Sequence, residues 1–177
     1  MLELIVSRQS DRSYSDKAIE KEKLERIIEA GRMAPSACNA QPWKFIIVTE
    51  PELRAGISVA ASAKLLGMNS FVNHAPLLLI VVREKANMSS RIGATVKNKD
   101  YSLIDIGIAS ENICLQAQAE GIGSCMIGWF DEKQIKKILG IPSSKRVELI
   151  ITLGYPAKEL RVKKRKPLSE TVSYNKY

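Results

Sequence analysis

The chain has 177 residues, of which 45% are hydrophobic and 26% are charged, proportions that are ordinary for a globular protein. Lysine and arginine outnumber aspartate and glutamate by 27 to 19, and the net charge of +8 suggests an anionic partner: nucleic acid, a membrane surface or a phosphorylated small molecule. No apolar run approaches the roughly 18 residues of a membrane helix, no signal peptide is visible, and the single histidine argues against a His-rich metal site or a Ser-His-Asp triad.

The first half of the chain is predicted to alternate helices with buried strands. Residues 20–33 place Leu24, Ile27 and Ile28 on one helical face, and the proline at position 35 ends this helix because the residue before a proline avoids helical angles. The sequence Thr-Glu-Pro-Glu at 49–52 predicts a capping box with proline just inside a second helix. The expected elements are a helix at 20–33, a loop at 34–42, a strand at 43–48, a helix at 49–66 and a strand at 77–83.

The second half opens with residues 85–100, which are rich in Asn, Ser, Lys and Gly and which we interpret as a flexible connection or lid. The longest predicted helix, 102–120, is apolar nearly all the way round, so it is expected to be buried centrally or between two chains. Glycines at 121 and 123 end it. A short strand at 124–127, a helix at 131–140 capped by Asp131, and a strand at 146–153 follow. This order predicts one domain over residues 1–177, of α/β or α+β class, with a sheet that is covered by helices and for which mixed strand directions are one alternative.

The positive charge is concentrated at the C-terminal end. Residues 158–177 hold seven bases and two acids, a net charge of +5 out of the +8. A disordered basic tail that binds nucleic acid is one interpretation. The apolar and aromatic side chains of Leu168, Tyr174 and Tyr177 favour a segment that docks instead.

Three short segments carry possible ligand signals. The glycines between 121 and 128 follow a helix, whereas a dinucleotide-binding loop must follow a strand, so that fingerprint fails. Arg8-Gln9-Ser10-Asp11-Arg12 offers guanidinium and hydroxyl donors suited to phosphate, although such a cluster alone is more often a solvated surface. The segment 35–43 concentrates small residues and amides, which indicates either a turn or a loop laid against a planar polar ligand.

In their order along the chain, these segments resemble the nitroreductase family of FMN-dependent oxidoreductases. The matching pieces are Arg8–Arg12, Ala34–Trp43, Ala75-Pro76, Asp105–Gly107 through Gly121–Gly123, Gly128 before Phe130-Asp131, and Lys163–Pro167. The resemblance spans nearly the whole chain. It implies an α+β fold with a central mixed or antiparallel sheet flanked by helices and an extended C-terminal tail. It also implies a cytoplasmic homodimer with two FMN sites at the subunit interface, and neither nucleic acid nor membrane as a partner.

The resemblance also implies which residues bind FMN, carried over by position. One subunit would contact the phosphate, ribityl chain and pyrimidine edge through its N-terminal segment and close on the phosphate through its tail. The partner subunit would approach through the loop after the first helix, and the short strand would lie along the isoalloxazine. The residues of the N-terminal segment are Arg8, Gln9, Ser10 and Arg12, and those of the tail are Lys163 and Arg165. The loop after the first helix contributes Pro35, Ser36, Ala37 and Asn39, and the short strand contributes Met126, Ile127 and Gly128. Gln9 and Ala37 depart from the more basic or hydroxyl residues of many relatives.

The family mechanism is ping-pong: NAD(P)H passes a hydride to flavin N5 and leaves, and a nitroaromatic, quinone or similar small-molecule acceptor then takes the reducing equivalents. Arg12 is the candidate for stabilising negative charge at flavin N1/O2, and the Gly128 backbone N–H is expected near N5. Cys38 and Cys125 are expected to be reduced packing residues without a catalytic thiolate. Two alternatives stay open: another reductive chemistry such as dehalogenation or flavin fragmentation, and a nucleic-acid-binding module that uses the basic tail.

Overall fold

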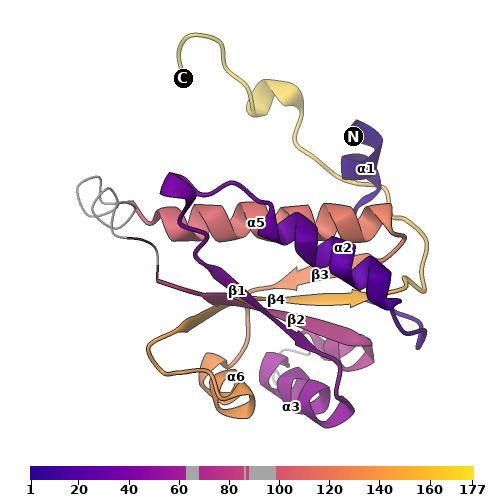
Figure 1. Cartoon of the computed structure of the whole chain (residues 1–177). Helices are drawn as coiled ribbons and strands as arrows, with labels where there is room; N and C mark the ends of the chain where they lie inside the picture. Colours follow the sequence, from indigo (N-terminus) through magenta and orange to yellow (C-terminus); the bar gives the residue numbers. More distant parts are fainter. Residues whose placement is uncertain (63–67, 86, 88–98) are drawn as a thin grey trace.

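The apolar segment Leu77–Arg83 forms strand β2, which lies inside a four-stranded sheet. The computed structural model describes residues 1–62, 68–85, 87 and 99–177. The other strands of the sheet are β1 (Trp43–Val48), β3 (Gly123–Ile127) and β4 (Arg146–Gly154). Their order is β1-β2-β4-β3 and every neighbouring pair is antiparallel (Figure 1), so of the two sheet types expected the antiparallel one is confirmed.

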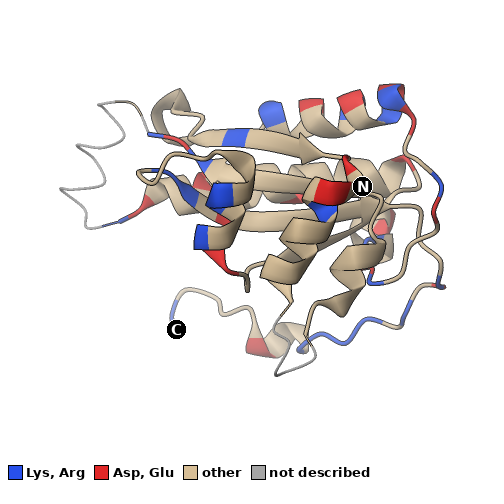
Figure 2. Cartoon of the chain, turned by 90° about the horizontal axis from the view of Figure 1, so that it is seen from below, with Lys and Arg blue, Asp and Glu red and all other residues tan. Residues whose placement is uncertain are grey.

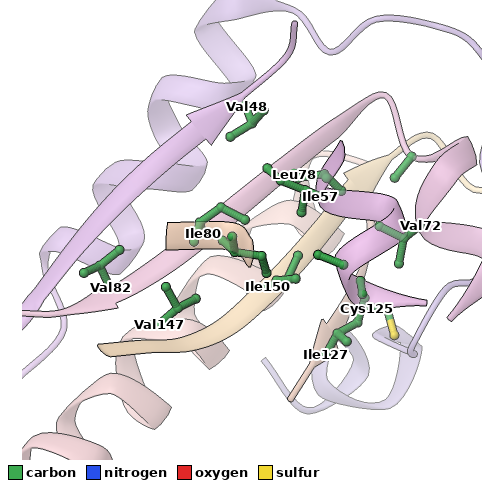
Figure 3. Packing of buried hydrophobic residues seen from close by; sticks show 14 of the residues in the cluster. Val48, Ile57, Val72, Leu78, Ile80, Val82, Cys125, Ile127, Val147 and Ile150 are labelled. Atoms are coloured by element: carbon green, nitrogen blue, oxygen red, sulfur yellow. The ribbon is translucent and has the colours of Figure 1, made fainter. Parts of the chain in front are cut away.

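Helices cover both faces of the sheet, which explains why β2 shows no polar alternation. Its side chains point alternately to two cores. Leu78, Ile80 and Val82 belong to the core beneath α3 (Pro51–Ala61) and α6 (Glu132–Leu139) (Figure 3). The intervening residues of β2 face α2 (Lys21–Arg32) and α5 (Tyr101–Ala119), which form the opposite layer (Figure 1).

The helix caps and helix ends in the structure can be compared with those predicted from the sequence. In α6 the Asp131 carboxylate accepts a hydrogen bond from the Gln134 N–H at 3.1 Å, and Gly140 ends the helix with φ of +62°, as expected. In α3, Pro51 does stand in the first turn, but the capping box is wrong: Glu50 is the N-cap residue and no side chain caps the helix. This helix also ends at Ala61 instead of Leu66, with Ser62 extended; positions 63–66 lie outside the described residues. Most of the segment interpreted as a lid, 85–100, lies outside them too.

Helix α5 has one buried and one uncovered side, although its sequence is apolar on both. The side toward the sheet includes Ile106 and Ile113. On the other side Leu103, Ile104 and Ile108 are 48%, 45% and 37% exposed. In the single chain α5 is therefore buried on one side only, whereas its sequence predicts burial on most sides. No helix among residues 1–62, 68–85 and 99–177 is long and apolar enough to cross a membrane.

Both ends of the chain lie on the α5 side of the sheet. A short N-terminal helix, α1 (Leu2–Ser7), was not predicted from the sequence. The C-terminal tail leaves β4 beside residues 13–15, where the Ser15 N–H donates to the Tyr155 carbonyl at 2.9 Å and the Ala157 N–H donates to the Ser13 carbonyl at 3.0 Å. Beyond this point the tail runs past α1, contains one short 3-10 turn, η4 (Leu168–Glu170), and extends away from the body (Figure 1).

Candidate functional site

The N-terminal segment and the tail together line a pocket of about 360 Å³, called here the basic pocket. Six of its nine lining residues are cationic and none is acidic. Figure 2 shows how closely lysines and arginines follow one another along the tail. The lining residues are Arg8, Gln9, Ser10, Arg12, Arg161, Val162, Lys163, Lys164 and Arg165.

The backbone of the N-terminal segment is held against the free edge of β3. Ser10 forms an isolated parallel bridge with Ser124, and the Asp11 N–H donates to the Ser124 carbonyl at 2.9 Å. Gly123 makes this approach possible, because a Cβ atom there would lie 2.6 Å from the Asp11 carboxylate oxygen Oδ2. The basic pocket therefore lies beside the strand that leads to Met126 and Gly128.

Gln9 joins the two walls of the pocket. Its side-chain oxygen accepts from the Arg161 N–H at 3.0 Å, and its amide nitrogen donates to the Asp11 carboxylate at 2.9 Å. The Arg161 guanidinium also donates to the Ser10 carbonyl at 2.7 Å. Gln9 is only 9% exposed, so both ends of its amide are already used inside the protein. The role expected for Gln9, a contact to FMN, stays a prediction, and the structure adds a linking role.

The charges in the basic pocket repel one another. The Lys163 ammonium donates to the Ile5 carbonyl at 2.6 Å. Partial desolvation and then the charges of Arg8 and Arg165 lower the pKa of Lys163. Arg8 is balanced by an ion pair with Glu111 on α5, 3.2 Å between Nε and Oε1. An anion in the pocket would relieve the remaining repulsion.

Arg12 is exposed and lies between two cavities. It lines the basic pocket and a neighbouring cavity of about 260 Å³ that also includes Lys158 and Glu159. Its guanidinium carbon lies 5.8 Å from the centre of the Phe71 ring. The position leaves the Arg12 guanidinium available to a bound ligand, as its expected role requires.

The predicted residues Pro35, Ser36, Ala37 and Asn39 lie elsewhere in the same chain. They surround a short 3-10 turn, η1 (Ala37–Asn39), which packs beside α5, and none of them lines the basic pocket. Pro35 and Asn39 are exposed. One chain therefore does not bring this group to the cationic residues, and its expected approach to FMN in a partner subunit stays a prediction.

The predicted residues at the end of β3 differ in what they can offer a ligand. Ile127 is buried in the core beneath α3 and α6, so only its backbone is available. Met126 is partly buried, and Gly128 is exposed with open space where a Cβ would lie.

The two cysteines named in the sequence analysis have different surroundings. Cys125 is buried, and its burial raises the pKa of the thiol, which favours an unreactive protonated form. Cys38 is exposed and does not pack within the single chain, and the expectation that it is not a catalytic thiolate stays a prediction.

Three lining residues were missed by sequence reasoning: the cations Arg161 and Lys164 and the apolar Val162. A usable signal existed for Arg161. In an extended segment, residues two apart point to the same side, so Arg161, Lys163 and Arg165 form one cationic edge. Lys164 departs from this alternation, and nothing in the local pattern marks it.

Comparison with known proteins identifies the family. The model of the nitroreductase family matches residues 5–155. The chain belongs to the nitroreductase family. A nitroreductase family protein from Clostridium novyi NT superposes with a TM-score of 0.78 at 36% sequence identity, over 88% of this chain and 84% of that one. The α+β fold expected from the resemblance is thereby confirmed.

Two further relatives have names that state an activity. One is an NADPH:FMN oxidoreductase from Vibrio harveyi, solved in complex with NAD⁺, with a TM-score of 0.83 and 26% identity over 99% of this chain and 77% of that one. The other is an iodotyrosine deiodinase from Haliscomenobacter hydrossis, 26% identical over 171 residues, which cover 85% of this chain and 76% of the relative.

Proposed function

We propose that this nitroreductase binds FMN in the basic pocket and uses NAD(P)H to reduce an acceptor such as a nitroaromatic or a quinone. The observation that carries the proposal is the convergence of six cations on one pocket of about 360 Å³. An extended nucleic-acid site would instead need a continuous basic face. The oxidoreductase from Vibrio harveyi supports the choice of FMN and of a nicotinamide donor.

The donor set fits a phosphate monoester. Arginine offers paired N–H donors with the spacing of phosphate oxygens, and Arg8 and Arg165 supply them from the two walls of the pocket. Lys163 adds a compact charge, and Ser10 a short hydroxyl contact. Partial desolvation and then the charges of Arg8 and Arg165 lower the pKa of Lys163, and a bound dianion would oppose this effect because it favours the charged ammonium.

Bound FMN would supply hydride acceptance and donation at N5, in the ping-pong order expected for the family. The contributions of the chain are orientation and electrostatics. Arg12, exposed at the pocket, would place positive charge where negative charge develops on the pyrimidine ring. Gly128 leaves room for a planar group to approach its backbone N–H. The protonated thiol of Cys125 would take no part.

We further infer that the site is completed by a second copy of the chain. The uncovered apolar side of α5, the η1 loop and the extended tail all lie on the same side of the sheet (Figure 1). Gly107 stands among the exposed apolar residues of α5 with open space around its missing Cβ. A glycine in the middle of a helix is destabilising, so a close approach by a partner would explain it. A cytoplasmic location stays a prediction from the sequence.

The proposal is tested by titrating the purified protein with FMN and with riboflavin, which lacks the phosphate. The variants Lys163→Ala and Arg165→Ala should each weaken FMN binding about tenfold or more, because each removes a charge-assisted contact. Riboflavin binding should be unchanged. Lys166→Ala is the matched control, since Lys166 neighbours these residues but does not line the pocket. Anaerobic bleaching of the flavin by NADH and NADPH then identifies the donor.

Three outcomes would contradict this proposal. Wild-type protein that binds no flavin would remove its basis, and colourless protein that binds DNA with strong salt dependence would favour the nucleic-acid alternative. Equal losses of FMN and riboflavin in the lysine and arginine variants would show that the basic pocket does not hold the phosphate.

Reductive dehalogenation is the second candidate, supported by the similarity to the iodotyrosine deiodinase. It uses the same flavin site with a different acceptor. Reoxidation of the reduced protein by iodotyrosine with release of iodide, and not by nitroaromatics or quinones, would favour it.

A further inference from the structure

The loop that begins with η1 is held in an unusual backbone conformation. Cys38, Asn39 and Gln41 have φ angles of +52°, +50° and +45°, although none of them is glycine. Side chains with a Cβ avoid this left-handed region, and three such residues within four positions form a strained loop. Strain of this kind persists only where surrounding contacts impose it.

Bonds inside the loop contribute to its shape but do not attach it to the body of the protein. The Gln41 N–H donates to the Ser36 hydroxyl at 3.0 Å, and the Gln41 side-chain amide donates to the Asn39 side-chain oxygen at 3.0 Å. The Asn39 N–H donates to the Ser36 carbonyl at 3.0 Å. These bonds would move with the loop if it shifted relative to the body.

Asp105 on α5 provides a contact from the body of the protein. Its carboxylate oxygen Oδ1 accepts the Ala37 N–H at 3.1 Å. The residue is only 4% exposed, and its other oxygen, Oδ2, is buried without a hydrogen-bond partner among the described residues. Burying a carboxylate with so few hydrogen-bond partners costs free energy. The hydrogen bond to the strained loop offsets part of this cost.

We propose that Asp105 is a positioning residue: its carboxylate holds the η1 loop in the conformation that presents Ser36 and Asn39 to FMN in the partner subunit's site. The inference rests on the proposed FMN-binding homodimer. Asp105 itself contacts the loop and not the ligand. Its place on α5 ties the loop to the same helix whose uncovered side is proposed to meet the second chain.

The first measurement is amide hydrogen exchange of the peptide 33–43 in the protein without added flavin. Asp105→Ala removes the acceptor of the Ala37 N–H, so exchange in this peptide should become faster. Asp105→Asn keeps a carbonyl oxygen of the same size and should preserve most of the protection. Ser110→Ala is the matched control, because Ser110 is also buried on α5 and its hydroxyl oxygen has no hydrogen-bond partner among the described residues. If the alanine variant does not fold, Asp105→Leu fills the space without an acceptor.

The second measurement is the FMN dissociation constant of the same variants. Asp105→Ala should raise it about tenfold, the value of one hydrogen bond to a charged group. Adding Cys38→Gly should restore part of the affinity, because glycine adopts a φ near +52° without steric cost. General damage to α5 would not be repaired by a glycine in the loop.

The outcomes separate this inference from the proposed function. Unchanged exchange in Asp105→Ala would overturn it whether or not the protein binds flavin. Faster exchange with unchanged FMN affinity would also overturn it, since the loop would then not be positioned for the ligand. A wild-type protein without FMN affinity would refute the proposed function and the positioning role together, while the exchange data would still report on the contact between Asp105 and Ala37.

Discussion

Gln9 is hydrogen-bonded to Arg161, which lies 152 positions further along the chain. Its amide accepts a hydrogen bond from the tail and donates one to a buried carboxylate of the N-terminal segment, Asp11. Burial raises the pKa of Asp11, and the bond from Gln9 opposes that effect. A glutamine can do both because one group carries a donor and an acceptor. A more basic residue at this position would offer a different set of bonds.

Replacing Gln9 with leucine should therefore weaken the basic pocket without removing any of its charges. The buried Asp11 carboxylate loses a donor, which should lower the free energy of unfolding by about 1–3 kcal/mol. The tail loses an attachment, so FMN affinity should also fall several-fold. Chemical denaturation and FMN titration measure the two effects. Gln134→Leu on the surface of α6 serves as the control, and equal behaviour of the two variants would contradict the linking role.

At the level of single residues, the sequence predicted the types of group in the site better than their roles. The guanidinium pair Arg8 and Arg12 and the tail residues Lys163 and Arg165 do line one pocket. The linking role of Gln9 and the anchoring contact of Asp105 depend on neighbours far away in the sequence. No local pattern reveals which partner a buried amide or carboxylate will meet after folding.

Helices α2 and α5 are held together by close packing at one point and by polar contacts at another. Gly31 allows their close packing, since a Cβ at this position would lie 2.6 Å from the Ile113 side chain. Near the C-terminal end of α5, the Arg26 guanidinium donates two hydrogen bonds to the Glu120 carboxylate, at 2.7 and 2.8 Å. The Lys23 ammonium donates to the Glu120 carbonyl at 2.9 Å. These contacts join α2 to the helix that carries Asp105.

The ion pair between Arg26 and Glu120 predicts a pH-dependent contribution to the stability of the folded protein. Hydrogen bonding from Arg26 lowers the pKa of Glu120 from 4.5 to about 2. A carboxylate with a lowered pKa stabilises the folded state above its ordinary pKa, and the contribution is lost as the pH falls from 4.5 toward 2. Glu120→Gln should therefore melt at a lower temperature than wild type at neutral pH, with the difference closing over this acidic range. Calorimetry across that range measures it.

A control for the acid range is Glu25→Gln. Glu25 is exposed on α2 and pairs with Lys21 of the same helix at 3.7 Å. An exposed pair within one helix contributes little, so its variant should show a smaller difference from wild type at all pH values. A melting-temperature difference for Glu120→Gln that stays constant down to pH 2 would contradict the assignment.

Elements with a clear local pattern were predicted well. The strands 43–48 and 77–83 have the expected bounds, because short apolar runs between turn residues leave little ambiguity. Helix α1 was missed, since it has six residues, buries none of them and so shows no pattern. The strand order β1-β2-β4-β3 could not be derived, because pairing depends on contacts between distant segments.

On the scale of the whole molecule, the chain exposes apolar surface of a kind that a folded monomer would ordinarily cover. Three large apolar residues of α5 are uncovered, and the tail exposes Leu160 and Val162 at 62% and 94%. Contiguous exposed apolar surface commonly marks a contact between proteins. The basic pocket and the η1 loop flank this surface, so assembly and cofactor binding are expected to depend on each other.

A charge placed on this surface should separate the subunits. Ile108→Glu would bury an unpaired carboxylate at the proposed interface, so the variant should shift from dimer to monomer and bind FMN at least tenfold more weakly. Sedimentation equilibrium and FMN titration test the two effects. Val59→Glu is the control, because Val59 is 50% exposed on α3, in the layer on the opposite side of the sheet. Dimers that persist in Ile108→Glu with normal FMN affinity would contradict the proposed assembly.

The attachment of the tail has a consequence for the order of events during protein synthesis. The last strand of the sheet ends at Gly154, and the residues that complete the basic pocket follow it, from Arg161 to Arg165. A ribosome therefore releases every strand before it releases the second wall of the pocket. The order of the chain therefore allows the sheet and its two layers to form before the cofactor binds, because both walls of the pocket exist only once the tail has been made.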